Sequence, residues 1–160
     1  MGLDITAYRN VVLQSSDPER DTDEDYYDGM TRLYPSTDFP QHACGLVDGR
    51  YSYDEHMSFR AGSYGGYSEW RDQLAKVAGY SGARDVWDKK LSGPFTELIN
   101  FSDCEGVIGS EMSRKLAKDF ADYQKQADAG QDDFGWFLPK YNDWRKAFEM
   151  ASHNGAVSFH

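Results

Sequence analysis

Alternating apolar and polar residues predict strands at the beginning, the middle and the end of the chain. The first covers Leu3–Leu13, and the third is Ala156–His160, which follows an Asn-Gly turn signal. The clearest is Arg50–Arg60. Its apolar face consists of Tyr51, Tyr53, Met57 and Phe59, with Glu55 as the single exception. We expect these three segments to lie in one sheet.

Three other segments show the three- and four-residue spacing of amphipathic helices. The helix beginning near Tyr67 has the stripe Tyr67, Trp70, Leu74 and Val77, and Gly79 is its expected C-terminal cap. The second stripe is Met112, Leu116, Phe120, Tyr123 and Ala127, with Ser110 as N-cap. The third is Phe137, Tyr141, Trp144 and Phe148, with Pro139 in the first turn.

Two shorter stretches complete the prediction. A short helix is expected around Ala83–Lys90, whereas Pro94–Phe101 fits a buried strand and a helical turn equally well. Strands at both ends, one central strand and three or four helices predict an α+β fold: a small, mostly antiparallel sheet with the helices packed on it. The length of 160 residues favours a single domain, 1–160.

An acidic stretch interrupts this pattern. Ser15–Gly29 carries seven Asp and Glu residues against the single base Arg20, a net charge of −6. Self-repulsion at this density disfavours a packed element, and residues up to about 49 contain Pro and Gly without a sustained period. We therefore expect an acidic, irregular excursion at about 15–49.

The overall charge narrows the classes of partner. The chain has 17 Lys and Arg against 27 Asp and Glu, a formal charge of −10, which disfavours direct nucleic-acid binding because phosphates are repelled. No segment resembles a membrane helix or a signal peptide, so membrane association is not expected. Two cysteines are too few for a disulfide scaffold, and a reduced, cytoplasmic environment follows.

The acidic stretch is itself a candidate partner-binding site. Its central carboxylates can mimic phosphates for a host protein with a basic surface, although a merely solvated loop explains the same composition. The residues assigned to this role are Asp21, Asp23, Glu24 and Asp25. The run begins like a calcium loop but has Tyr26 where the turn glycine belongs and Arg32 at the closing position.

A second candidate is the glycine-rich corner between the central strand and the first helix. A strand, a tight turn and a helix start together present backbone N–H groups that hold anions. The corner is neither a P-loop nor a complete GxGxxG motif, and a tightly packed corner is the alternative interpretation. Its candidate ligand-binding residues, for example for a nucleotide, are Arg60, Ser63, Tyr64, Tyr67 and Arg71.

The third candidate is the turn at 102–105, which we expect to face that corner. It resembles the middle of an EF-hand loop, but Phe101 and Met112 replace both anchoring ligands, so no metal is assigned. The turn is therefore either a ligand site or a helix cap. Its candidate ligand-binding residues are Ser102, Asp103 and Glu105. Spacing brings no nucleophile next to a base, so no catalytic residue and no cofactor are assigned.

Several blocks of the chain resemble a family of small uncharacterised proteins of bacteria, phages and prophages. The blocks are MGLDITAY, FRAGSYGGYSEWRDQLAKVAGY, PFTELINFSDCEGVIG and GAVSFH, whereas the acidic stretch 15–49 has no counterpart. The family supplies no activity or residue role. The resemblance implies a phage-associated accessory context, in which such proteins often counter host defence systems.

Two functional hypotheses follow. The first is a non-enzymatic phage or prophage accessory protein that inhibits a host defence or nucleic-acid-handling protein through its acidic surface. The alternative is a protein that binds or sequesters a small ligand such as a nucleotide, with a hydrolase as a less favoured variant. A structural or regulatory protein without a ligand also remains open.

Overall fold

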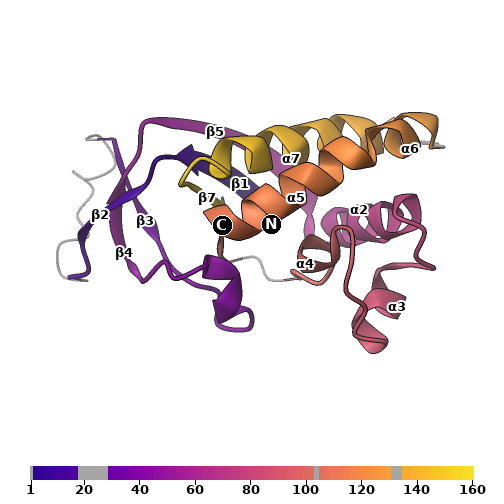
Figure 1. The fold of residues 1–160 in the computed structure, drawn as a ribbon, viewed down its shortest axis with the longest axis horizontal. Helices are drawn as coiled ribbons and strands as arrows, with labels where there is room; N and C mark the ends of the chain where they lie inside the picture. Colours follow the sequence, from indigo (N-terminus) through magenta and orange to yellow (C-terminus); the bar gives the residue numbers. More distant parts are fainter. Residues whose placement is uncertain (1, 18–28, 103–104, 131–134) are drawn as a thin grey trace.

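The computed structural model describes residues 2–17, 29–102, 105–130 and 135–160. The fold is α+β, as predicted, with two small antiparallel sheets and about three substantial helices packed on them (Figure 1). The strands are β1 (Gly2–Arg9), β2 (Val12–Ser15), β3 (Met30–Leu33), β4 (Gly49–Ser52), β5 (Glu55–Ser63), β6 (Gly106–Gly109) and β7 (Ala156–Phe159). The helices are η2 (Pro40–Ala43), α2 (Tyr64–Val77), α3 (Ala83–Asp88), α4 (Thr96–Ile99), α5 (Ser110–Asp122), α6 (Gln124–Ala129) and α7 (Phe137–Ala151).

The main sheet has the strand order β5-β1-β7-β6, and all of its pairs are antiparallel. Three of its strands come from the three predicted segments, which confirms that these segments share a sheet. The fourth strand, β6, is not predicted. It has four residues, two of them glycines, and all are buried, so neither alternation nor β-propensity marks it in the sequence.

Both long predicted strands are interrupted, which corrects the prediction of one sheet. The first bends at Asn10, whose φ is +51°, and the second breaks between β4 and β5. The two breaks lie side by side, because Asn10 donates a hydrogen bond to Asp54 at 2.7 Å and the Asp54 N–H bonds the Arg9 carbonyl. Beyond them, β2, β4 and β3 form a second sheet with β4 in the centre. Thus a strand, β3, and a helical turn, η2, fall within the stretch predicted to be irregular.

The large core lies between the main sheet and the helices, with α5 and α7 running side by side over it (Figure 1). The predicted stripes face inward: Trp70, Leu74, Leu116, Phe120, Tyr141, Trp144 and Phe148 are at most 1% exposed. At its centre Trp144 stacks on Trp70 with 5.6 Å between ring centroids. A second, smaller core on the other side of the sheet joins Tyr8 and Val107 to Leu33 and Tyr51 of the second sheet.

The helix ends mostly agree with the sequence signals. Gly79 follows the end of α2 with a φ of +91°, and Pro139 is the third residue of α7. The ambiguous stretch 94–101 contains the helical turn α4. Ser110 is not the N-cap of α5 but its first residue. The capping position belongs to Gly109, the last residue of β6, because the helix follows the strand without a loop.

Candidate functional site

The predicted partner-binding residues, Asp21, Asp23, Glu24 and Asp25, lie outside the described residues, as does Asp103. The acidic run itself is a feature of the sequence, because Ser15–Gly29 carries a net −6 of the total −10. The described residues, here called the frame, hold 16 of the 17 Lys and Arg and 18 of the 27 Asp and Glu.

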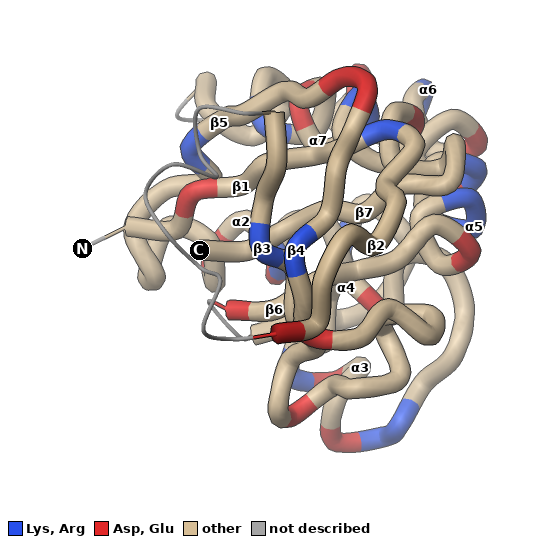
Figure 2. The backbone as a smooth tube through the Cα atoms, turned by 90° about the vertical axis from the view of Figure 1, so that its left-hand side faces the viewer, with Lys and Arg blue, Asp and Glu red and all other residues tan. Residues whose placement is uncertain are grey.

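Within the frame, positively and negatively charged residues are interspersed along the backbone (Figure 2). Many of them form ion pairs, for example Arg32–Asp48 and Asp72–Lys76. Many pairs are one helical turn apart, which is the spacing at which opposite charges meet on a helix. These pairs are Asp72–Lys76, Arg84–Asp88, Asp85–Lys89, Lys118–Asp122 and Arg145–Glu149. Much of the charge on the described helices is thus paired within the same helix.

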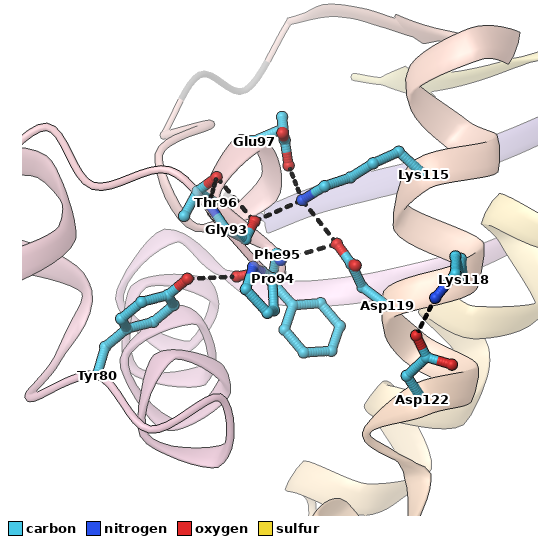
Figure 3. A network of polar contacts seen from close by, with 10 residues as sticks. All are labelled: Tyr80, Gly93, Pro94, Phe95, Thr96, Glu97, Lys115, Lys118, Asp119 and Asp122. Atoms are coloured by element: carbon cyan, nitrogen blue, oxygen red, sulfur yellow. Dashed lines mark hydrogen bonds and ion pairs between the residues drawn. The ribbon is translucent and has the colours of Figure 1, made fainter.

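The most connected polar cluster joins α5 to the turn before α4 (Figure 3). The Lys115 ammonium donates to the Gly93 carbonyl at 2.5 Å and lies 2.7 Å from both the Glu97 and Asp119 carboxylates. Asp119 also accepts a 3.0 Å hydrogen bond from the backbone N–H of Phe95, whose φ is +62°. All three donor sites of the ammonium are used, so the cluster fixes a turn and offers no vacant ligand position.

The structure divides the residues of the glycine-rich corner into two groups. Arg60 extends along the sheet to Asp4, with 3.2 Å between Nη1 and Oδ2. The Ser63 hydroxyl accepts a hydrogen bond from the Gly66 N–H at 3.0 Å and so caps α2. Tyr64 is 46% exposed.

Tyr67 and Arg71 form the second group and bind the backbone just before the 102–105 turn. The buried Tyr67 hydroxyl donates to the Phe101 carbonyl at 2.8 Å, and Arg71 donates to the Ile99 carbonyl at 2.6 Å. The Arg71 guanidinium also lies 4.9 Å from the centre of the Tyr67 ring. Burial raises the pKa of Tyr67 above its ordinary value, so the residue is a neutral donor. The corner therefore contacts the backbone of residues 99 and 101, just before the turn, and these two side chains serve packing.

The 102–105 turn precedes a strand, which revises its interpretation as a helix cap. Ser102 and Glu105 are exposed, and β6 begins directly after Glu105. Since four strand residues follow Glu105 before α5 begins, Ser102 and Glu105 do not cap that helix, whereas Asp103 lies outside the described residues. Gly106 explains the glycine of the motif: its φ is +112°, and an added Cβ would lie 2.6 Å from the Ser36 backbone.

Sequence reasoning missed a polar row on the face of the main sheet opposite the helices. Thr6 Oγ1 lies 2.9 Å from Ser58 Oγ and 3.0 Å from His160 Nε2, which links three adjacent strands. Thr6 is 6% exposed, whereas Ser58 and His160 are exposed. Only the cross-strand register reveals this row, because its members are 52 and 154 residues apart in the sequence.

A buried histidine was also missed. His42 forms a three-ring cluster with Phe39 and Phe101, in which its ring centroid lies 5.3 and 5.6 Å from theirs and theirs lie 5.3 Å apart. Its Nδ1 is buried without a hydrogen-bond partner. Desolvation lowers its pKa, against an opposing effect of the Glu97 carboxylate, and favours the neutral ring. This environment suits a role of His42 in aromatic packing. The residues next to His42 in the sequence do not indicate that its side chain is buried.

One open groove of about 450 Å³ lies away from all the predicted sites. It is formed by the C-terminal part of α2, by α6 and by the start of α7. Its lining residues are Gln73, Lys76, Val77, Gln126, Ala129, Gly130 and Phe137. The volume is within the range of small-molecule sites, and the lining combines an apolar floor with two side-chain amides.

A scan against protein-family models, a search of curated proteins and a search of solved structures each find no match to this chain. In the ranges that the structure describes, no helix is both long and apolar enough to cross a membrane. In the same ranges, no three His, Cys, Asp or Glu side chains come together to form a metal site.

Proposed function

We propose that this protein is a non-enzymatic accessory binding protein of a phage or prophage. In this proposal it inhibits a host defence or nucleic-acid-handling protein by presenting negative charge to that protein's basic surface. The observation that carries the proposal is the concentration of acidic residues in one stretch of the sequence. Ser15–Gly29 carries a net −6 of the total −10.

This concentration matters because carboxylates in large excess over the Lys and Arg of the same stretch attract a basic surface. Excess carboxylates raise the rate of encounter with a basic surface and then form charge-assisted hydrogen bonds with Lys and Arg. The largest excess, 18–28, connects β2 to β3, the two outer strands of the second sheet. In this proposal, strands β2 and β3 hold the two ends of the acidic stretch, and the acidic residues come between them in the sequence.

The test is affinity capture from a bacterial lysate with a variant in which Asp21→Asn, Asp23→Asn, Glu24→Gln and Asp25→Asn are combined. We expect the wild type to retain a basic protein that the variant loses, because four of the attracting charges are gone. Mass spectrometry of the retained proteins identifies the partner and measures its depletion.

A matched control removes the same amount of charge from the frame. The combined changes Asp38→Asn, Glu69→Gln, Glu111→Gln and Asp128→Asn neutralise four exposed acids on the frame. This control should retain the partner. Equal loss with both variants would show that only net charge matters, and retention by the first variant would refute the proposed role of the segment.

The groove at α2 and α6 favours a second candidate function, the binding of a small ligand. A planar ring with a hydrogen-bonding edge, such as a nucleobase, matches the apolar floor and the amides of Gln73 and Gln126. Adenosine at 100 times its dissociation constant should stabilise the protein by about 2.7 kcal/mol in a thermal-shift assay. Ala129→Phe fills the groove and should abolish the shift; a shift that persists in this variant excludes the site.

A further inference from the structure

The outer edge of β5 carries unpaired backbone groups. In β1, Asp4 exchanges both backbone hydrogen bonds with His160, so Asp4, Thr6 and Tyr8 direct their N–H and C=O groups toward β7. Their partners on the other side are Arg60, Ser58 and His56. These three therefore direct their own backbone groups away from the sheet, because the direction alternates along an antiparallel strand.

One of these groups is already bound. The Lys140 ammonium donates to the Arg60 carbonyl, which protects that end of the edge. The backbone groups of His56 and Ser58 make no hydrogen bond to any described residue. Both residues are exposed, and the half-buried Met57 and Phe59 flank them on the helix side. The edge is therefore open at His56 and Ser58 with respect to the described residues.

The opposite edge of the same sheet is covered. All of β6 is buried, and an added Cβ at Gly109 would lie 2.4 Å from the Ala43 carbonyl of η2. The contrast is informative, because exposed edges are templates for pairing with another chain and proteins usually protect them. Among the described residues, one edge of the main sheet is buried along all of β6, and the other is covered at Arg60.

We propose that the β5 edge is a docking site at which an extended segment of a basic partner protein adds as a fifth strand. Main-chain hydrogen bonds to His56 and Ser58 would supply affinity, and alternate side chains would meet Met57 and Phe59. Charge selects the occupant. Two copies of this chain, each at −10, repel one another, whereas a basic segment is attracted. Only this choice of a basic segment rests on the proposed function.

The probe is a synthetic peptide amide, Lys-Val-Thr-Val-Lys-Val-Thr-Lys, titrated into the ¹⁵N-labelled protein. We expect amide shifts centred on β5 and slower hydrogen exchange of the His56 and Ser58 N–H groups at saturation. Ser58→Pro removes one outward N–H and should weaken binding at least tenfold, since proline is tolerated on an edge where its nitrogen faces solvent. Ser58→Ala loses the same hydroxyl but keeps the N–H, and it should bind like the wild type.

Four results would overturn the proposal: no binding at millimolar peptide, shifts centred elsewhere, equal binding by the two Ser58 variants, or equal binding of a peptide with Glu in place of Lys. His56→Pro replaces Ser58→Pro if the latter fails to fold. Failure here is distinguishable from failure of the proposed function. Lysate capture that depends on Asp21–Asp25 but not on Ser58→Pro would reject the edge alone.

Discussion

Replacing Trp144 by alanine should lower the free energy of unfolding by about 3–5 kcal/mol, the usual cost of deleting a large buried aromatic side chain. The Trp144 side chain is fully buried and stands where the helix layer meets the main sheet. Its ring contacts Trp70, Phe59 and Phe159 with 5.6, 5.1 and 5.6 Å between centroids. These neighbours belong to three other elements, so local collapse cannot refill the cavity. Urea denaturation followed by circular dichroism measures the change.

Trp87→Ala is the matched control, because it removes the same side chain from an exposed position. Trp87 is 56% exposed and meets Phe39 only edge to face, at 6.2 Å. We expect a loss of at most about 0.5 kcal/mol, as for most surface substitutions. Similar losses in the two variants would contradict the packing described for α7.

Lys115→Met should have the second largest effect, a loss of about 2 kcal/mol in the free energy of unfolding. The substitution keeps the length of the side chain but leaves the Gly93 carbonyl and the carboxylates of Glu97 and Asp119 without their shared donor (Figure 3). These carboxylates are only 22% and 14% exposed, so water replaces the ammonium poorly. Thermal unfolding measures the loss.

Lys118→Met tests whether this effect comes from the cluster or from charge alone. Lys118 also pairs with a carboxylate one turn away, that of Asp122, but both side chains are mostly exposed. Exposed pairs contribute about 0–1 kcal/mol. Equal effects of the two substitutions would show that Lys115 does not hold the turn before α4.

The parts of the fold predicted from sequence are those with long, regular patterns. The inward stripe of α7, from Phe137 to Phe148, repeats over three turns, and the face of β5 that holds Met57 and Phe59 alternates regularly. The division into two sheets was not predicted, although Glu55, the one exception on the apolar face, lies at the break. At that break Asp54 accepts a long-range hydrogen bond from Asn10, which has no sequence signature. β6 was missed because burial on both faces removes alternation from a four-residue strand.

For the candidate sites, too, sequence indicated some features, whereas others are visible only in the structure. Sequence predicted that the glycine-rich corner lies beside the 102–105 turn, and the structure shows a bond from Tyr67 to the carbonyl of Phe101, just before that turn. The sequence did not show that the Tyr67 and Arg71 side chains donate hydrogen bonds to backbone carbonyls, since such partners have no sequence signature. The open edge of β5 requires the register of three strands. Composition, by contrast, located the acidic excess directly.

We propose that the acidic residues Asp21, Asp23, Glu24 and Asp25 bind a basic partner. The most direct measurement is the dissociation constant of the captured partner as a function of NaCl concentration, since screening weakens exposed charge interactions over about 10 Å at 0.1 M salt. For the wild type and the frame-neutralised control, the account predicts steep weakening with rising salt. For the variant neutralised at Asp21, Asp23, Glu24 and Asp25, it predicts weaker binding and a shallower salt dependence. An unchanged dissociation constant and slope in that variant would contradict it.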